Sequence, residues 1–273
     1  MQAVVTKQWL DAHHTNVVLA DVRWYLDGRS GRTAFETAHA PRAVYVDLDT
    51  WLAGPASPDY GRHPLPDPSV FARGMTAHGI SDDSTVVAYD DAGGVIAARL
   101  VWMLRATGHE AALLDGGLAE FANTFESGAG ASRAPGTFDE RPWPLERLAT
   151  IDEAAERSNV VIDARNRDRY EGAPDNVDPR FGHIPGAKSV PCRENLDATG
   201  RLRPLVDVRA AFEAAGVHPD TAVIAYCGSG VTACHDLVVM EWAGYGIGRL
   251  FPGSWSQYSN DSRRPIATGS SPG

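Results

Sequence analysis

Cysteine is scarce in this chain, and long apolar runs are missing from it. The 273 residues include three cysteines, Cys192, Cys227 and Cys234, and no apolar stretch long enough to span a bilayer. An odd, low number of cysteines argues against a disulfide framework and predicts a reducing compartment, which we expect to be the cytoplasm. The first residues lack the apolar core and cleavage site of a signal peptide. No cysteine and histidine cluster has zinc spacing, so we expect no metal. The sequence implies no organic cofactor either.

Basic residues are also in deficit. The chain has 25 Lys and Arg against 35 Asp and Glu, which leaves a formal net charge of -10. Such a surface repels nucleic acid and anionic membrane, so we expect neither as a partner. A small anionic substrate remains compatible with this charge, because a local cluster of arginines can bind one.

The sequence repeats itself with a period of about half its length. Four segments of the first half return in the second half in the same order. Each pair gives the first copy and then its repeat: 16–24 and 159–167, 38–48 and 182–192, 71–100 and 212–237, 113–121 and 250–258. For example, "NVVLADVRW" returns as "NVVIDARNR". Four ordered matches predict two copies of one domain.

Short apolar runs alternate with helical patterns within each copy. The runs "VVIDA" and "TAVIAY" are typical of buried parallel strands, and "PLVDVRAAFEAAG" is typical of a covering helix. We therefore predict an α/β fold in which each copy is a small parallel sheet with helices on both faces. The predicted domains are residues 1–125 and 151–273, joined by a Gly-, Pro- and Ser-rich linker at 126–150.

The stretch "YCGSGVTA" (226–233) places Cys227 between a predicted strand and a predicted helix. Ligands of parallel sheets bind at the carboxyl ends of the strands. The Gly-Ser-Gly that follows can curl so that its backbone N–H groups face inward and stabilise negative charge, together with the helix N-terminus. This field favours the nucleophilic thiolate of Cys227. By contrast, we expect Cys234 to be core and Cys192 to be structural.

The first copy serves as an internal control for this loop. Its segment "YDDAGGVIAA" keeps the loop, but alignment of the Gly-Val pairs places Asp91 opposite Cys227. Without a thiol the first copy cannot perform the same covalent chemistry. We therefore expect one catalytic and one noncatalytic copy, the latter forming a wall of the active-site cleft.

Two α/β repeats with one loop cysteine in the second resemble the tandem-domain rhodanese family of sulfurtransferases. The loop "CGSGVTA" is similar to that of the 3-mercaptopyruvate sulfurtransferase branch. "GHIPGA" (182–187), "FPGSWSQY" (251–258) and "DGG" (115–117) match further family signatures, so the resemblance covers nearly the whole chain. It implies that Cys227 takes a sulfane sulfur from a small-molecule donor and becomes a persulfide. The persulfide then passes its sulfur to a thiophilic acceptor such as a small thiol, thioredoxin or cyanide.

The loop composition bears on the identity of the donor. Relatives specialised for thiosulfate usually carry basic side chains in this loop, whereas the loop here is uncharged. Its residues, which we expect to line the donor site, are Gly228, Ser229, Gly230, Val231 and Thr232. This favours 3-mercaptopyruvate, whose carboxylate and ketone suit the fork of an arginine. By resemblance, Arg169 and Arg180 bind these two groups.

The resemblance also implies a proton relay for the enolate that remains when the sulfur leaves. Ser229 matches the loop serine of the family, and His39 in "AHAPRAV" matches the histidine of a first-domain motif. Asp27 is the nearest aspartate to complete the relay. His183 is the counterpart of His39 in the second copy, where we expect a structural hydrogen bond.

Three alternative functions have to be weighed. A cysteine phosphatase needs Cys-x5-Arg, and position 233 is alanine, which disfavours this function. Thiosulfate:cyanide sulfurtransferase as the main activity is compatible with the sequence. So is a noncatalytic persulfide carrier or regulatory module, because the same loop serves both. Arg169 and Arg180 distinguish an enzyme from a carrier, since a small-molecule pocket needs them and a carrier does not.

Overall fold

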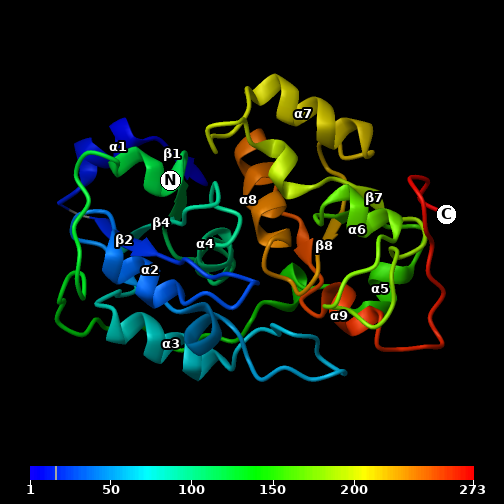
Figure 1. Cartoon of the computed structure of the whole chain (residues 1–273), viewed down its shortest axis with the longest axis horizontal. Helices are drawn as coiled ribbons and strands as arrows, with labels where there is room; N and C mark the ends of the chain where they lie inside the picture. Colours follow the sequence, from blue (N-terminus) through cyan, green and yellow to red (C-terminus); the bar gives the residue numbers. More distant parts are fainter. Residues whose placement is uncertain (16) are drawn as a thin grey trace. The chain divides into compact units, whose positions relative to one another are not determined.

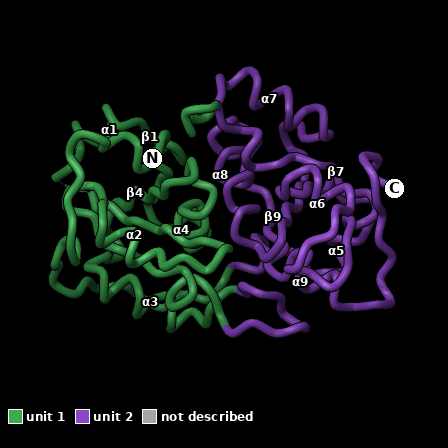
Figure 2. Tube along the Cα trace, in the orientation of Figure 1, with its two compact units in different colours: residues 1–54, 65–143, 198–202 green, residues 55–64, 144–197, 203–273 purple. Residues whose placement is uncertain are grey.

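The computed structural model describes residues 1–15 and 17–273, which form two compact units (Figure 1, Figure 2). Unit 1 comprises residues 1–54, 65–143 and 198–202, and unit 2 comprises residues 55–64, 144–197 and 203–273. Each unit contains one parallel sheet, which confirms the predicted α/β fold. Asn16, the first residue of the first repeated segment, lies outside the described residues.

The sheet of unit 1 has the strand order β1-β5-β4-β2-β3, with every neighbouring pair parallel. Its strands are β1 (Val4–Val5), β2 (Val17–Asp21), β3 (Val44–Tyr45), β4 (Thr85–Tyr89) and β5 (Ala111–Leu114). Its helices are α1 (Lys7–His13), α2 (Gly31–Thr37), α3 (Pro68–Ala77) and α4 (Ala98–Ala106), with short helical turns at Leu48–Leu52 and Gly117–Phe121. All of β2 and β5 is buried, which explains their continuous apolar sequences.

The sheet of unit 2 has the order β7-β6-β8-β9 and is also parallel. Its strands are β6 (Val160–Asp163), β7 (Lys188–Ser189), β8 (Val223–Tyr226) and β9 (Arg249–Leu250). Its helices are α5 (Ile151–Ala155), α6 (Arg167–Glu171), α7 (Leu205–Ala214), α8 (Ala233–Ala243) and α9 (Ser254–Tyr258), with short turns at Leu145–Arg147 and Cys192–Asn195. No described helix is both long and apolar enough to cross a bilayer.

Four strands of the unit 1 sheet, in the order β5-β4-β2-β3, correspond to β9-β8-β6-β7 of unit 2. In unit 1 the aspartate that ends β2 pairs with the tyrosine that ends β4, and in unit 2 the aspartate that ends β6 pairs with the tyrosine that ends β8. Where unit 1 has β1 beside β5, unit 2 has a single parallel bridge from Leu148 to Leu250 in β9. The register therefore confirms that the chain contains two copies of one domain.

One short segment from each half groups with the other unit. Residues 55–64 belong to unit 2 and residues 198–202 belong to unit 1, as the colours of Figure 2 show. Both segments precede the first long helix of their own half, α3 and α7. The predicted domains are contiguous in sequence and do not include this exchange of segments. A sequence repeat does not indicate with which unit a loop groups. The predicted linker at 126–150 is divided between the units after Trp143.

Candidate functional site

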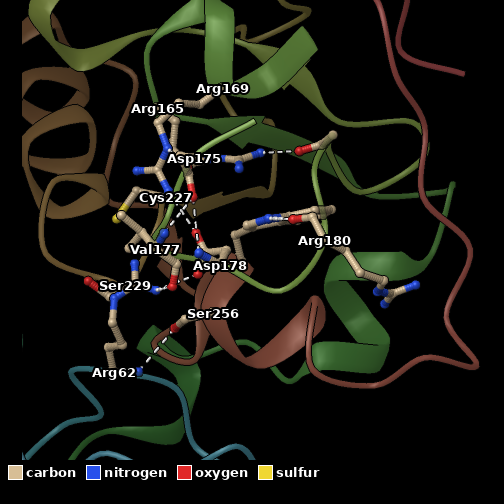
Figure 3. Close-up of polar contacts among 12 residues, drawn as sticks. Arg62, Arg165, Arg169, Asp175, Val177, Asp178, Arg180, Cys227, Ser229 and Ser256 are labelled. Carbon is tan, nitrogen blue, oxygen red and sulfur yellow. Dashed lines mark hydrogen bonds and ion pairs between the residues drawn. The ribbon is translucent and has the colours of Figure 1, made fainter. Parts of the chain in front are cut away.

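Cys227 directly follows β8, at the carboxyl end of an inner strand of the unit 2 sheet (Figure 3). It is buried, and its Sγ accepts the backbone N–H of Gly230 at 3.1 Å. Gly230 has φ +77°, in the left-handed region that favours glycine, and a methyl group there would lie 2.5 Å from the carbonyl oxygen of Pro252. The glycine thus lets the loop curl back on the sulfur, as the sequence predicts.

The segment that follows β9 holds this loop in place. Ser254 accepts the backbone N–H of Cys227 on its Oγ at 3.1 Å. The backbone N–H groups of Trp255 and Ser256 donate to the carbonyl oxygens of Cys227 and Gly228, at 3.0 and 2.8 Å. Ser254 itself has φ +51°, a strained conformation that persists where the surrounding structure imposes it. The "PGSWSQ" sequence therefore acts as a support for the cysteine loop.

The equivalent loop of unit 1 holds a carboxylate where unit 2 holds a thiol. Asp90 directly follows β4, as Cys227 follows β8, so Asp90 and not Asp91 is its counterpart. The predicted alignment was wrong by one residue because the first loop is one residue longer before its valine. The carboxylate of Asp90 accepts four backbone N–H groups at 2.7 to 2.9 Å, those of Ala92, Gly94, Ile96 and Ala97. Burial raises the pKa of Asp90, while these four N–H groups act to lower it. The loop of unit 1 therefore directs four backbone N–H groups at one side chain, an arrangement that suits negative charge at the equivalent position of unit 2.

Arg169, on α6, lies beside the cysteine loop. Its Nε donates to Asp175 and its Nη2 donates to Asp178, both at 2.7 Å. Its remaining terminal nitrogen, Nη1, would be 3.5 Å from a methyl group on Gly228. The structure thus brings this predicted site residue to the loop, where one face of its guanidinium remains available to a ligand.

A second arginine at the loop, Arg62, was not predicted. It belongs to the segment 55–64 of unit 2, and its Nη1 forms an ion pair with Asp178. Its Nη2 would be 3.1 Å from a methyl group on Gly228, on the same residue that Arg169 approaches. The only local signal is an Arg-His pair in the "GRHPLP" sequence of the first half, and nothing in the spacing connects that pair to Cys227.

Arg180 does not lie at the loop, and its predicted role is wrong. Its guanidinium donates to four backbone carbonyl oxygens around the end of α9, those of Tyr258, Ser259, Asp261 and Arg264. Figure 3 shows its side chain directed away from Cys227. The last carbonyl groups of a helix lack partners within it, and an arginine satisfies them well. Arg180 is therefore a structural residue.

The histidine that contacts Ser229 is His63. Its Nδ1 lies 2.7 Å from the Ser229 Oγ, and both side chains are buried. His39, the predicted partner, is buried in unit 1 with its Nδ1 2.8 Å from the carbonyl oxygen of Phe35 and its ring stacked on Phe35. His183 makes the same arrangement with Tyr170 in unit 2, which confirms the structural hydrogen bond predicted for it. We therefore replace His39 by His63 in the predicted relay.

Asp27 also has a local role. Its side chain is 58% exposed and accepts the backbone N–H and the Nε–H of Arg29 within one turn of unit 1. These hydrogen bonds lower the pKa of Asp27. Because its hydrogen bonds among the described residues all come from Arg29, Asp27 is a poor relay partner, and we withdraw it from the site.

The remaining cysteines and loop residues complete the environment. Cys234, in the first turn of α8, is buried, and its thiol donates to the carbonyl oxygen of Gly230 at 3.3 Å. Burial raises the pKa of the Cys192 thiol, which disfavours its thiolate form. Val231 is buried and Thr232 directly precedes α8, so both belong to the turn into the helix. Across residues 1–15 and 17–273, no group of three or more His, Cys, Asp or Glu side chains is arranged to hold a metal ion.

Comparisons with known proteins agree with this geometry. The model of the rhodanese-like domain matches residues 6–124 and 148–261. The chain is 37% identical to "Probable 3-mercaptopyruvate sulfurtransferase" of Pseudomonas aeruginosa, over 97% of this chain and 98% of that protein. It is 30% identical to "Thiosulfate/3-mercaptopyruvate sulfurtransferase 1, mitochondrial" of Arabidopsis thaliana, over 97% of this chain and 78% of that protein.

A solved structure shows the same likeness in three dimensions. The 3-mercaptopyruvate sulfurtransferase from Leishmania major superposes with a TM-score of 0.88 at 29% identity, over 97% of this chain and 76% of that chain. Two matched domains, two parallel sheets in the same register and one cysteine loop all point the same way. The chain therefore belongs to the rhodanese family, as a sulfurtransferase with two rhodanese-like domains.

Proposed function

We propose that this enzyme transfers a sulfane sulfur from 3-mercaptopyruvate to a thiol acceptor through a persulfide on Cys227. The observation that carries the proposal is the Cys227 sulfur after β8, which accepts the Gly230 N–H at 3.1 Å on a loop whose Gly228 faces the guanidinium of Arg169. The N–H group stabilises a thiolate or a terminal persulfide anion, and the guanidinium suits a carboxylate. Two of the similar proteins reported above carry 3-mercaptopyruvate sulfurtransferase in their names.

The proposed reaction has two halves. The Cys227 thiolate attacks the sulfur of 3-mercaptopyruvate, a sulfur–sulfur bond forms, and the carbon–sulfur bond breaks with its electron pair going to carbon. The resulting enolate takes a proton and leaves as pyruvate. In the second half a nucleophilic acceptor, such as a thiolate, attacks the outer sulfur of the persulfide, takes that sulfur and regenerates the Cys227 thiolate. The acceptor, whether a small thiol, thioredoxin or cyanide, remains a prediction.

We assign proton transfer to the pair formed by Ser229 and His63. The 2.7 Å contact between Ser229 Oγ and His63 Nδ1 allows the hydroxyl to donate toward the enolate while the imidazole replaces its proton. Ser229 lies two residues after Cys227, on the loop that carries the reacting sulfur. A relay in this position protonates the leaving carbon without opening the site to bulk water.

Thiosulfate is the second candidate donor. The free terminal N–H group of Arg169 can donate to a sulfonate oxygen as well as to a carboxylate. The cysteine loop itself carries no charge, however, and a dianion needs more positive charge than a monoanion. A pure carrier module is disfavoured, because it has no use for an arginine directed at the loop.

Intact-mass spectrometry after exposure to each donor tests the proposal. We expect 3-mercaptopyruvate to add one sulfur atom to the wild-type chain and none to Cys227→Ser, and we expect thiosulfate to load more slowly. Equal or faster loading by thiosulfate would overturn the choice of donor. Loading of the Cys227→Ser variant would overturn the nucleophile, and no loading from either donor would favour the carrier module.

A further inference from the structure

Arg62 is held at the cysteine loop by a backbone that has little freedom. Its own N–H donates to the Ser256 Oγ at 3.0 Å, and Ser256 in turn donates its backbone N–H to Gly228. The preceding residue, Gly61, packs so closely that a methyl group there would lie 2.5 Å from the carbonyl oxygen of Gly253. The segment 55–64 is thus packed against the same support that fixes the loop, and Arg62 leaves it at a defined point.

The side chain of Arg62 is paired with that of Arg169 through one carboxylate. Asp178, whose side chain is 1% exposed, accepts Arg62 Nη1 on Oδ1 and Arg169 Nη2 on Oδ2, the latter at 2.7 Å. A buried carboxylate between two guanidinium groups offsets their mutual repulsion and fixes both planes. Figure 3 shows Asp178 below Arg169 and close to Ser229 and Cys227.

The donors that remain on the two arginines are those that face the loop. Among the described residues, Arg62 Nη2 and Arg169 Nη1 make no hydrogen bond, and these are the two atoms nearest to a methyl group placed on Gly228. The Nε of Arg62 is buried and has no hydrogen-bond partner among the described residues either. A buried guanidinium nitrogen without a partner is costly unless a ligand satisfies it. The side chains of Arg62 and Arg169 are 26% and 20% exposed, so a small molecule can reach them.

We propose that Arg62, in place of Arg180, supplies the second guanidinium of the donor site. Resting on the proposed function, this assigns the carboxylate and ketone oxygens of the donor to Arg62 and Arg169 together. The two cations are balanced by Asp175 and Asp178, so the four side chains carry no net charge. Such a site binds through directed N–H groups and favours a monoanionic 2-oxo acid over a compact dianion.

The first test measures anion binding without sulfur transfer. Iodoacetate and iodoacetamide alkylate the Cys227 thiolate by the same displacement of iodide and differ mainly in charge. We expect Arg62→Met to lower the ratio of the iodoacetate rate to the iodoacetamide rate by about tenfold or more. Peptide mapping restricts the measurement to Cys227.

The matched control is Arg167→Met. Arg167 lies on the same helix as Arg169, is 56% exposed and pairs with Glu194, so its removal should leave the ratio unchanged. A wild-type ratio in a folded Arg62→Met variant would overturn the proposal. An equal fall of the ratio in Arg167→Met would also overturn it, because the loss of any one positive charge would then explain the result.

A second variant covers the case in which Arg62→Met fails to fold. Arg62→Lys keeps the charge and loses the fork, so we expect a severalfold higher KM for 3-mercaptopyruvate with nearly unchanged reaction with iodoacetamide. An unchanged KM would overturn the assignment. If the wild-type enzyme does not react with 3-mercaptopyruvate, the proposed function fails, and the alkylation ratio still decides whether Arg62 binds an anion beside Cys227.

Discussion

Replacement of Gly230 by alanine should separate the reactivity of the sulfur from the binding of the donor. The Gly230 N–H donates to the Cys227 Sγ at 3.1 Å, and the residue has φ +77°. Alanine in this conformation costs about 1 kcal/mol or more. Its methyl group would also lie 2.5 Å from the Pro252 carbonyl oxygen, a contact that forces the backbone to move. The movement should take the N–H away from the sulfur.

The expected magnitude follows from the lost hydrogen bond. A hydrogen bond to a charged acceptor contributes about 1.5–3 kcal/mol, so the rate of persulfide formation should fall by about 10-fold to 100-fold. The assay is single-turnover loading with 3-mercaptopyruvate followed by intact mass, with thermal unfolding to show that the variant is folded. Reaction with iodoacetamide, which needs only the thiolate, should slow by a similar factor.

Gly228→Ala is the matched control. Gly228 is not in the left-handed region, and its methyl group would meet only the ends of the Arg62 and Arg169 side chains, at 3.1 and 3.5 Å. This variant should raise the KM for 3-mercaptopyruvate and leave the iodoacetamide rate close to that of the wild type. Wild-type loading and iodoacetamide rates in a folded Gly230→Ala variant would refute the reasoning about the loop N–H group.

Two further predictions concern the relay and the stability of unit 2. His63→Ala and Ser229→Ala should each lower kcat with 3-mercaptopyruvate by about a hundredfold. The double variant should have nearly the same kcat as either single variant, because both residues act in one relay. Losses of activation free energy that add in the double variant would contradict a shared relay. The backbone N–H of Thr150, with the Arg249 side chain, lowers the pKa of Glu153 to about 2, so its contribution to folding is complete above about pH 4.5 and is lost as the pH falls toward 2. Glu153→Gln should therefore lower the free energy of unfolding at pH 7 by no more than about 1 kcal/mol, because the side chain is 37% exposed, and urea denaturation should show the difference shrinking toward pH 2. A difference that stays constant from pH 3 to pH 7 would show that the ionisation of Glu153 is not its source.

The comparison of Cys227 with Asp90 shows how far a repeat in the sequence can lead. The matched segments are sufficient to predict two parallel sheets, and a cysteine at a strand end followed by Gly-Ser-Gly is sufficient to locate the proposed nucleophile. Both depend on residues close together in the chain. The identification of Asp90 as the counterpart of Cys227 required the strand register of the structure. The sequence of one protein does not show where a loop has one extra residue.

Arg180 and His39 show where motif similarity misleads. Each lies near a recognisable motif, and each forms hydrogen bonds with backbone carbonyl oxygens instead of facing the cysteine loop. Arg180 bonds those at the end of α9, and His39 bonds that of Phe35. A motif identifies residue types but not the direction of a side chain. An arginine near "GHIPGA" is as suited to satisfying helix carbonyl groups as to binding a carboxylate.

The sequence by itself thus determined the α/β repeats and the curled loop that carries Cys227, because local strand, turn and helix preferences act over a few neighbouring residues. Only the tertiary structure decided which basic side chains reach that loop. Arg62 and His63 come from a segment of the first half that groups with unit 2, more than 160 residues before Ser229 in the chain. The close approach of Gly61 to Gly253 and the bridge through Asp178 depend on packing between distant segments, and such packing leaves no periodic trace in the sequence.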